Sequence, residues 1–181
     1  MNKEKRLPAS PKNRPASERA VENLQKHSDE ALKGLFEVAV DVDDIAPDAE
    51  RDGLIPAAVL MHAKKRLLKA QIPITDDWLC PTLWVIVDSV KSSDGLTYAV
   101  NLQMELNDFD DIQREPAVPS YGPVWQKRVL LMVEAEGLLG VYAFVDDLAD
   151  EFARAYHSAN GTQPPKAHPE PKRNTRRKSA R

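Results

Sequence analysis

The sequence predicts an α+β domain, a two-layer sandwich of three helices on a mostly antiparallel sheet of about four strands, in the order αβαβββα. Two observations carry this prediction. Three segments place apolar residues at the three-to-four-residue spacing of a helix, and four segments resemble strands, most of them with one apolar face. A sheet with one apolar face needs helices on one side only, so two layers are expected.

The first helix is expected between Ser17, a suitable N-cap, and Gly34, a residue that ends helices. Its apolar positions keep a helical spacing: Val21, Leu24, Ala31, Leu32 and Leu35. A strand is expected from Phe36 to Val42, because apolar residues there alternate with Glu37, Ala39 and Asp41. This strand should bury one face and leave the other in water.

The remaining elements follow from the same periodicities and from turn residues. Pro56 suits a first helical turn, and an apolar stripe predicts a second helix up to Ala70. Strands are expected at 83–90 and 97–106, joined by the Ser92–Gly95 turn, and at 124–133 after a polar loop from Asn107 to Pro123, forming an antiparallel meander. A third helix is expected from about Leu138 to Asn160–Gly161.

Charge and proline divide the chain into a body and two tails. Residues 20–161 carry 12 Lys or Arg and 25 Asp or Glu, a net charge of −13, whereas residues 1–19 carry +4 and residues 162–181 carry +6, which gives −3 in total. Half of the 14 prolines lie near the ends, with few large apolar residues. We therefore expect a disordered basic tail at 1–16, a domain at 17–161 and a disordered, proline-rich basic tail at 162–181.

Cysteine usage and apolar runs indicate the compartment. Cys80 is the one cysteine, so neither an internal disulfide nor a multi-cysteine zinc site is expected. No apolar run follows the basic start of the chain as in a signal peptide, and none approaches the ~20 residues of a membrane helix. We expect a cytoplasmic protein with no membrane partner.

An acidic pattern is the strongest catalytic signal. The segment from Val38 to Ile45 reads as an apolar strand that delivers Asp41 and Asp43 at its end. This resembles the first motif of haloacid dehalogenase-type phosphotransferases, and the resemblance implies Asp41 as nucleophile, Asp43 as acid/base and Mg²⁺ as the metal. Phe144–Asp147 resembles the late acidic motif of that family, although its spacing here is helical.

The preferred interpretation of these aspartates is simpler: they form the water-facing side of a one-sided strand. An EF-hand reading of the same stretch fails, because Ala46 and Asp52 stand where a Gly and a bidentate Glu are needed. The four histidines lack metal spacing, and His62 is expected on a solvated helix face. We therefore expect no catalytic residue, no metal and no cofactor.

Two kinds of binding residue remain. Trp84 and Trp125 are out of phase with their apolar neighbours, so both are candidates for exposed anchors on the outer face of the sheet. The basic C-terminal tail offers contacts to phosphates through Lys172, Arg173, Arg176, Arg177 and Lys178.

These observations favour a non-enzymatic protein-interaction module that acts in an intracellular protein assembly, with another protein as partner. The alternatives are a nucleic-acid-associated protein that uses the basic tail, and a small Mg²⁺-dependent phosphotransferase that uses Asp41 and Asp43. The oligomeric state is not predicted by the sequence.

Overall fold

The computed structural model describes residues 30–77, 79–112 and 118–163. The strands are β1 (Val38–Val42), β2 (Ile74–Thr75), β3 (Thr82–Lys91), β4 (Thr97–Ile112) and β5 (Val118–Glu134). The helices are α2 (Pro47–Arg51), α3 (Pro56–Lys69) and α4 (Val141–Asn160), and the 3-10 helix η2 (Ala135–Gly140) precedes α4. The fold is a mixed α/β arrangement with one five-stranded sheet, close to the expected α+β sandwich.

The sheet has the strand order β2-β1-β3-β4-β5 and is mixed, so the prediction of four mostly antiparallel strands is corrected. β1 pairs in parallel with both β2 and β3, while β3, β4 and β5 form the predicted antiparallel meander. The parallel half follows from the chain path, since α3 lies between β1 and the two strands beside it. A strand, a crossover helix and a second strand in one sheet make a parallel pair.

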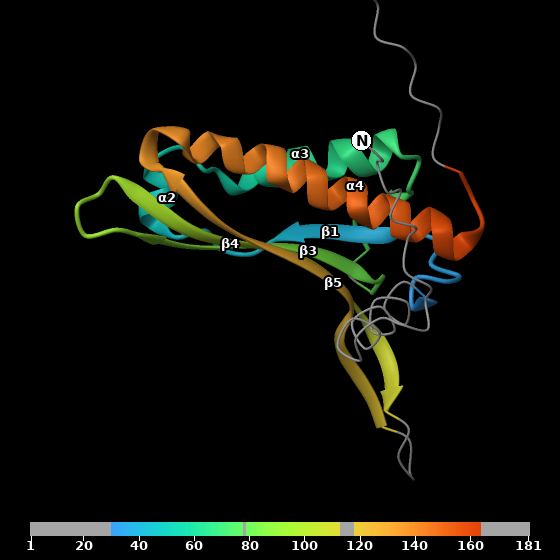
Figure 1. The fold of residues 1–181 in the computed structure, drawn as a ribbon. Coiled ribbons are helices and arrows are strands. Elements are labelled where there is room, and N and C mark those ends of the chain that lie inside the picture. Colours follow the sequence, from blue (N-terminus) through green and yellow to red (C-terminus); the bar gives the residue numbers. More distant parts are fainter. Residues whose placement is uncertain (1–29, 78, 113–117, 164–181) are drawn as a thin grey trace, which may run out of the picture.

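Strands β4 and β5 extend far into the segment predicted as a polar loop, which corrects that prediction. Their pairing runs to Ile112 and Val118. Leu106 pairs with Trp125 and Asn107 with Pro123, so Val124 is an extra residue, a β-bulge. Figure 1 shows the long hairpin bending away from the helical layer beyond this region.

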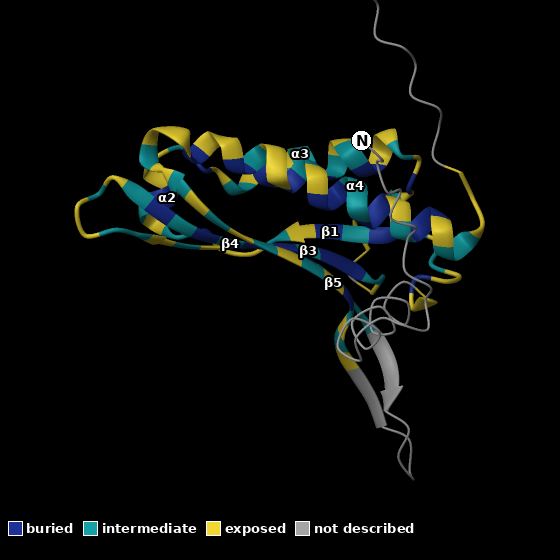
Figure 2. Ribbon diagram, in the orientation of Figure 1, coloured by how far each residue is buried: buried dark blue, intermediate teal, exposed yellow. Residues whose placement is uncertain are grey.

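Helices α3 and α4 lie side by side over one face of the sheet (Figure 1). Their inner faces are buried at the predicted positions, and Figure 2 shows the buried stripe of α4 turned toward the sheet. Two predicted helix boundaries are confirmed: Pro56 begins α3, and Gly161 ends α4 with a left-handed φ of 64°. The predicted start of the last helix at about Leu138 falls within η2, and α4 begins at Val141. The buried residues of these helices are Val59, Ala63, Leu67, Val141, Val145, Leu148, Phe152 and Tyr156.

The start of the described chain is fastened to the end of α4. The side chain of Asn160 accepts a hydrogen bond from the backbone N–H of Gly34 at 2.8 Å and donates one to the carbonyl of Leu32 at 3.0 Å. Phe36, predicted to begin the first strand, lies outside β1 and is 78% exposed. Most of the predicted first helix and nearly all of both predicted tails lie outside the described residues.

Candidate protein-interaction surface

We call the side of the sheet opposite α3 and α4 the open face. Strand pairing arranges its side chains in rows that cross β3, β4 and β5. One row is Val90, Ala99 and Met132, and the next is Asp88, Asn101 and Leu130. The other rows are Ile86–Gln103–Arg128 and Trp84–Glu105–Gln126, with Asp41 of β1 beside Trp84.

The first two rows expose large apolar side chains. The exposed fractions are 71% for Val90, 75% for Leu130 and 73% for Met132. Single exposed apolar residues are common on proteins, but three from neighbouring strands on one face form a patch, and such patches mark interaction sites. We call these three residues the apolar patch.

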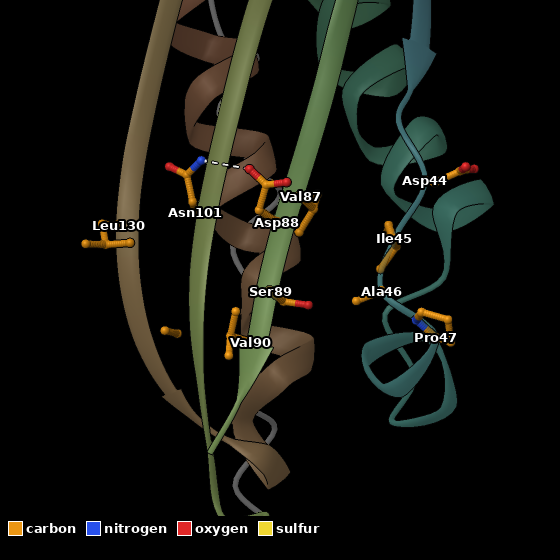
Figure 3. Close-up of a pocket in the computed structure, with 11 residues that line it drawn as sticks. Asp44, Ile45, Ala46, Pro47, Val87, Asp88, Ser89, Val90, Asn101 and Leu130 are labelled. Carbon is orange, nitrogen blue, oxygen red and sulfur yellow. Dashed lines mark hydrogen bonds between the residues drawn. The ribbon is translucent and has the colours of Figure 1, made fainter. Parts of the chain in front are cut away.

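A groove of roughly 600 Å³ lies beside the apolar patch. Figure 3 shows its two sides: the segment from Asp44 to Pro47, which follows β1, and the strands β3 to β5. Asn101 and Asp88 lie on the strand side, where the Asn101 amide donates a hydrogen bond of 3.1 Å to the Asp88 carboxylate. Val90 and Leu130 belong to both the groove and the apolar patch.

The groove runs along a part of β3 that has no strand on its β1 side among the residues that the structure describes. β1 ends at Val42. The last backbone hydrogen bond from this segment to β3 is donated by the Asp43 N–H to the carbonyl of Val85, at 3.0 Å. Backbone groups of a strand alternate between its two sides, so those of Val87 and Ser89 also point to the side that β1 has left. The hydroxyl oxygen of Ser89 is buried and has no hydrogen-bond partner among the described residues.

Acidic side chains surround the groove. Asp44 and Asp88 line it, and Asp41 and Asp43 are exposed on and just after β1. The Asp41 carboxylate accepts a hydrogen bond from the N–H of Val42, and that of Asp43 accepts one from Asp44, both at 2.8 Å. Arg128 supplies positive charge among the charged residues described on the open face, but the side chains around the groove are acidic. A cationic partner is therefore favoured near the groove.

The two candidate tryptophans lie in different places. Trp84 is on the open face as expected, and it is half-buried. Trp125 faces the helices and is 1% exposed, with its ring centroid 5.0 Å from that of Phe152, so its expected position on the outer face is corrected. The cause lies in β5, where Val129 and Leu131 point inward while Leu130 and Met132 point outward, so apolar residues occur on both faces.

The acidic motifs that resemble the haloacid dehalogenase type lie on opposite sides of the sheet. Asp41 is on the open face, whereas Asp146 belongs to α4 and contacts Nδ1 of His62 at 3.1 Å. The described residues contain no group of three or more His, Cys, Asp or Glu side chains that would hold a metal ion. The geometry therefore keeps apart the two acidic motifs that the resemblance combines in one site.

The polar residues of the helical layer serve mainly to join α3 to α4. His62 is half-buried rather than solvated, because its ring stacks on Tyr142 with centroids 5.0 Å apart. Arg66 forms an ion pair with Asp150. His157 is buried, and its Nε2 lies 2.8 Å from the carbonyl of Ala70, to which it must donate because a carbonyl only accepts.

Cys80 is poorly suited to nucleophilic chemistry. Partial burial raises the pKa of its thiol, and the nearby carboxylates of Glu37 and Asp77 raise it further. The Sγ atom lies 3.7 Å from Oε1 of Glu37. A thiol with a raised pKa supplies little thiolate at neutral pH, and the thiolate is the reactive form.

Comparison with known proteins adds a distant structural likeness. No family model matches the chain, and no curated protein matches it. Among solved structures, the chain is similar to a minor lipoprotein from Acinetobacter baumannii, with 13% identity, 76% of this chain and 99% of that chain covered, and a TM-score of 0.36. A likeness at this level carries no argument about function.

Sequence reasoning missed the apolar patch and the groove. The signal was present, because apolar residues occupy both faces of the segments 85–90 and 129–133. A strand that is apolar on both faces has a second surface to cover.

The five basic candidates from Lys172 to Lys178 lie outside the described residues. Within the part of the chain that the structure describes, no helix is both long and apolar enough to cross a membrane.

Proposed function

We propose that this protein is a non-enzymatic protein-interaction module of a cytoplasmic protein assembly, and that it docks an extended protein segment in the groove of the open face. The segment carries alternating apolar and basic side chains. The single observation that carries the proposal is the apolar patch of Val90, Leu130 and Met132, which lies beside the unpaired part of β3.

Each property of the proposed segment matches a property of the groove. An extended backbone supplies hydrogen bonds to Val87 and Ser89, as in the addition of a strand to a sheet edge. Apolar side chains on one face of the segment cover Val90 and Leu130. Lys or Arg side chains on its other positions give the complex a dependence on salt, because the acidic side chains of Asp44 and Asp88 line the groove.

The cytoplasmic setting rests on cysteine usage. A chain with one cysteine, held as a free and half-buried thiol, suits a reducing compartment. The nucleic-acid alternative rests on basic residues outside the described part of the chain, and it stays a prediction from the sequence.

The test is a titration of ¹⁵N-labelled protein, followed by NMR, with a short peptide of alternating Val and Lys and with a matched peptide of Val and Glu. We expect the basic peptide to shift the amide signals of Val87, Asp88, Ser89 and Asn101, and the acidic peptide to leave them unchanged. Added salt should weaken the binding of the basic peptide.

A matched pair of variants locates the contact. Val90→Lys places a charge within the apolar patch, while Leu68→Lys places the same charge on α3, where Leu68 is 60% exposed against 71% for Val90. We expect the first to abolish the shifts and the second to preserve them. Shifts that survive Val90→Lys, or that fall on α3 and α4, would contradict the proposed docking site.

A further inference from the structure

The side chains along the outer edge of β5 are complementary to one another in charge and in apolar character. β5 is an edge strand of the sheet, so its side away from β4 meets no other strand among the described residues. An open edge is a template for pairing with another chain. This edge follows β5 whereas the groove follows β3, although Leu130 belongs to both.

Hydrogen bonding at the hairpin end indicates which residues of β5 face outward. The N–H of Ala135 bonds the carbonyl of Leu96, and the N–H of Ser92 bonds the carbonyl of Thr97. Thr97 therefore turns its backbone groups toward β3, and Glu134, which lies opposite Thr97, is not bonded to it. Backbone groups alternate along a strand, so Arg128, Leu130, Met132 and Glu134 all present theirs to the open edge.

The side chains of the same four residues form a palindrome of chemical properties around Leu131. Leu130 and Met132 flank it as exposed apolar residues, and Arg128 and Glu134 follow as exposed residues of opposite charge. Neither charged side chain has an ion-pair partner in the described part of the chain. Toward its other end the edge closes to pairing, because Pro119 and Pro123 lack an N–H.

We infer that β5 pairs with β5 of a second copy of this chain, antiparallel and with the two-fold axis at Leu131. In this register Leu130 lies opposite Met132 of the partner copy, and Arg128 lies opposite Glu134. All four residues then meet partners whose backbone groups also face the edge, as antiparallel hydrogen-bonded pairs require. Two ion pairs and four apolar side chains are joined on the open face.

Charge reversal tests this register directly. Arg128→Glu places two carboxylates opposite each other at both ends of the pairing, and Glu134→Arg does the same with two cations. We expect each single variant to weaken dimerisation by about tenfold or more, measured by sedimentation equilibrium over a range of concentrations. The matched control Arg154→Glu, on an exposed position of α4, should dimerise like the unmodified chain.

A mixture of the two variants gives the decisive result. In an equimolar mixture of Arg128→Glu and Glu134→Arg chains, each heterodimer restores two oppositely charged pairs, so dimers should reappear. Restored dimers support the register, as does dimerisation of the double variant. A monomeric unmodified chain, or a mixture as weak as either variant alone, would overturn the inference. These variants leave the residues that line the groove unchanged, so a loss of dimerisation with peptide binding retained distinguishes the two proposals.

Discussion

Trp125 of β5 and Phe152 of α4 meet edge to face, with ring centroids 5.0 Å apart and an angle of 77° between their planes. Both are buried, and this contact joins the sheet to the helical layer. Aromatic pairs in this arrangement stabilise proteins beyond the burial of their area.

Phe152→Ala should therefore lower the free energy of unfolding by about 3–5 kcal/mol, because a large buried ring is lost and a cavity remains. Urea denaturation measures this change. Phe36→Ala, at a position that is 78% exposed, is the control and should change stability by less than about 0.5 kcal/mol. An equal midpoint for the unmodified protein and Phe152→Ala would be incompatible with the packing described.

His157 fastens the end of α4 to the end of α3. Its Nε2 donates to the carbonyl of Ala70, and its Nδ1 lies 2.6 Å from the hydroxyl of Thr162. His157→Leu should cost about 1–3 kcal/mol, since polar groups around it lose their partner. His62→Leu, at a half-buried position, should lower the stability by less than His157→Leu. A larger loss for His62→Leu than for His157→Leu in thermal denaturation would contradict this account.

Ser89→Ala should be neutral or slightly stabilising. The hydroxyl oxygen of Ser89 is buried without a partner among the described residues, so its removal sacrifices no hydrogen bond seen there. Chemical denaturation of the free protein checks this expectation. A loss of more than about 1 kcal/mol would mean that the hydroxyl is already bonded in the free protein.

Stability should fall at both extremes of pH because of one cluster, in which Asp52 at the end of α2 contacts Lys91 of β3 and Tyr98 of β4. Lys91 and Tyr98 both donate hydrogen bonds to the Asp52 carboxylate, at 2.6 and 2.8 Å, and hold its pKa below the ordinary value. The same contact with Asp52 raises the pKa of Lys91. The carboxylate thus stabilises the fold above its unfolded pKa of about 4, and this contribution is lost as pH falls through the lower folded value.

The basic limb has the opposite sign. The contribution of Lys91 is complete below its unfolded pKa of about 10.4 and is lost as pH rises through the higher folded value. Asp52→Asn should reduce the slopes of both limbs in a series of melting temperatures. The acid slope should not vanish, because Ser92 and the N–H of Leu96 also lower the pKa of Asp94. A pH profile identical to that of the unmodified protein would refute the assignment.

The aspartates of the first strand should be dispensable for stability. The carboxylates of Asp41 and Asp43 accept bonds only from the next residue in the chain among the described contacts, and an Asn side-chain oxygen can accept the same bonds. The double substitution to Asn should leave stability equal or slightly higher, because repulsion among acids decreases. Mg²⁺-dependent hydrolysis of a phosphate ester that disappears in Asp41→Asn would instead restore the phosphotransferase alternative.

The sequence predicts the helices and strands better than it predicts how the strands pair and how far they extend. The spacing of Val141, Val145 and Phe152 determines α4, and the Ser92–Gly95 turn determines the β3–β4 hairpin, because both depend on local periodicity. β2 was missed because two residues give no periodicity. The extension of β4 and β5 was missed because polar and proline residues there resemble a loop, although an edge strand accepts them.

The candidate site was harder to predict, because it depends on contacts between distant strands. Val90 and Met132 are brought into one row through Ala99, and only the strand register determines this. Trp125 was misplaced for the same reason, since the bulge at Val124 and the two apolar faces of β5 hide which side is inner.

The contacts of Asn160 with Leu32 and Gly34 also couple the two ends of the described chain. One side chain bonds backbone groups 126 and 128 residues away, so the end of α4 and the segment before β1 lose a shared contact when either of them unfolds. Local unfolding at one end of the described chain is therefore coupled to unfolding at the other.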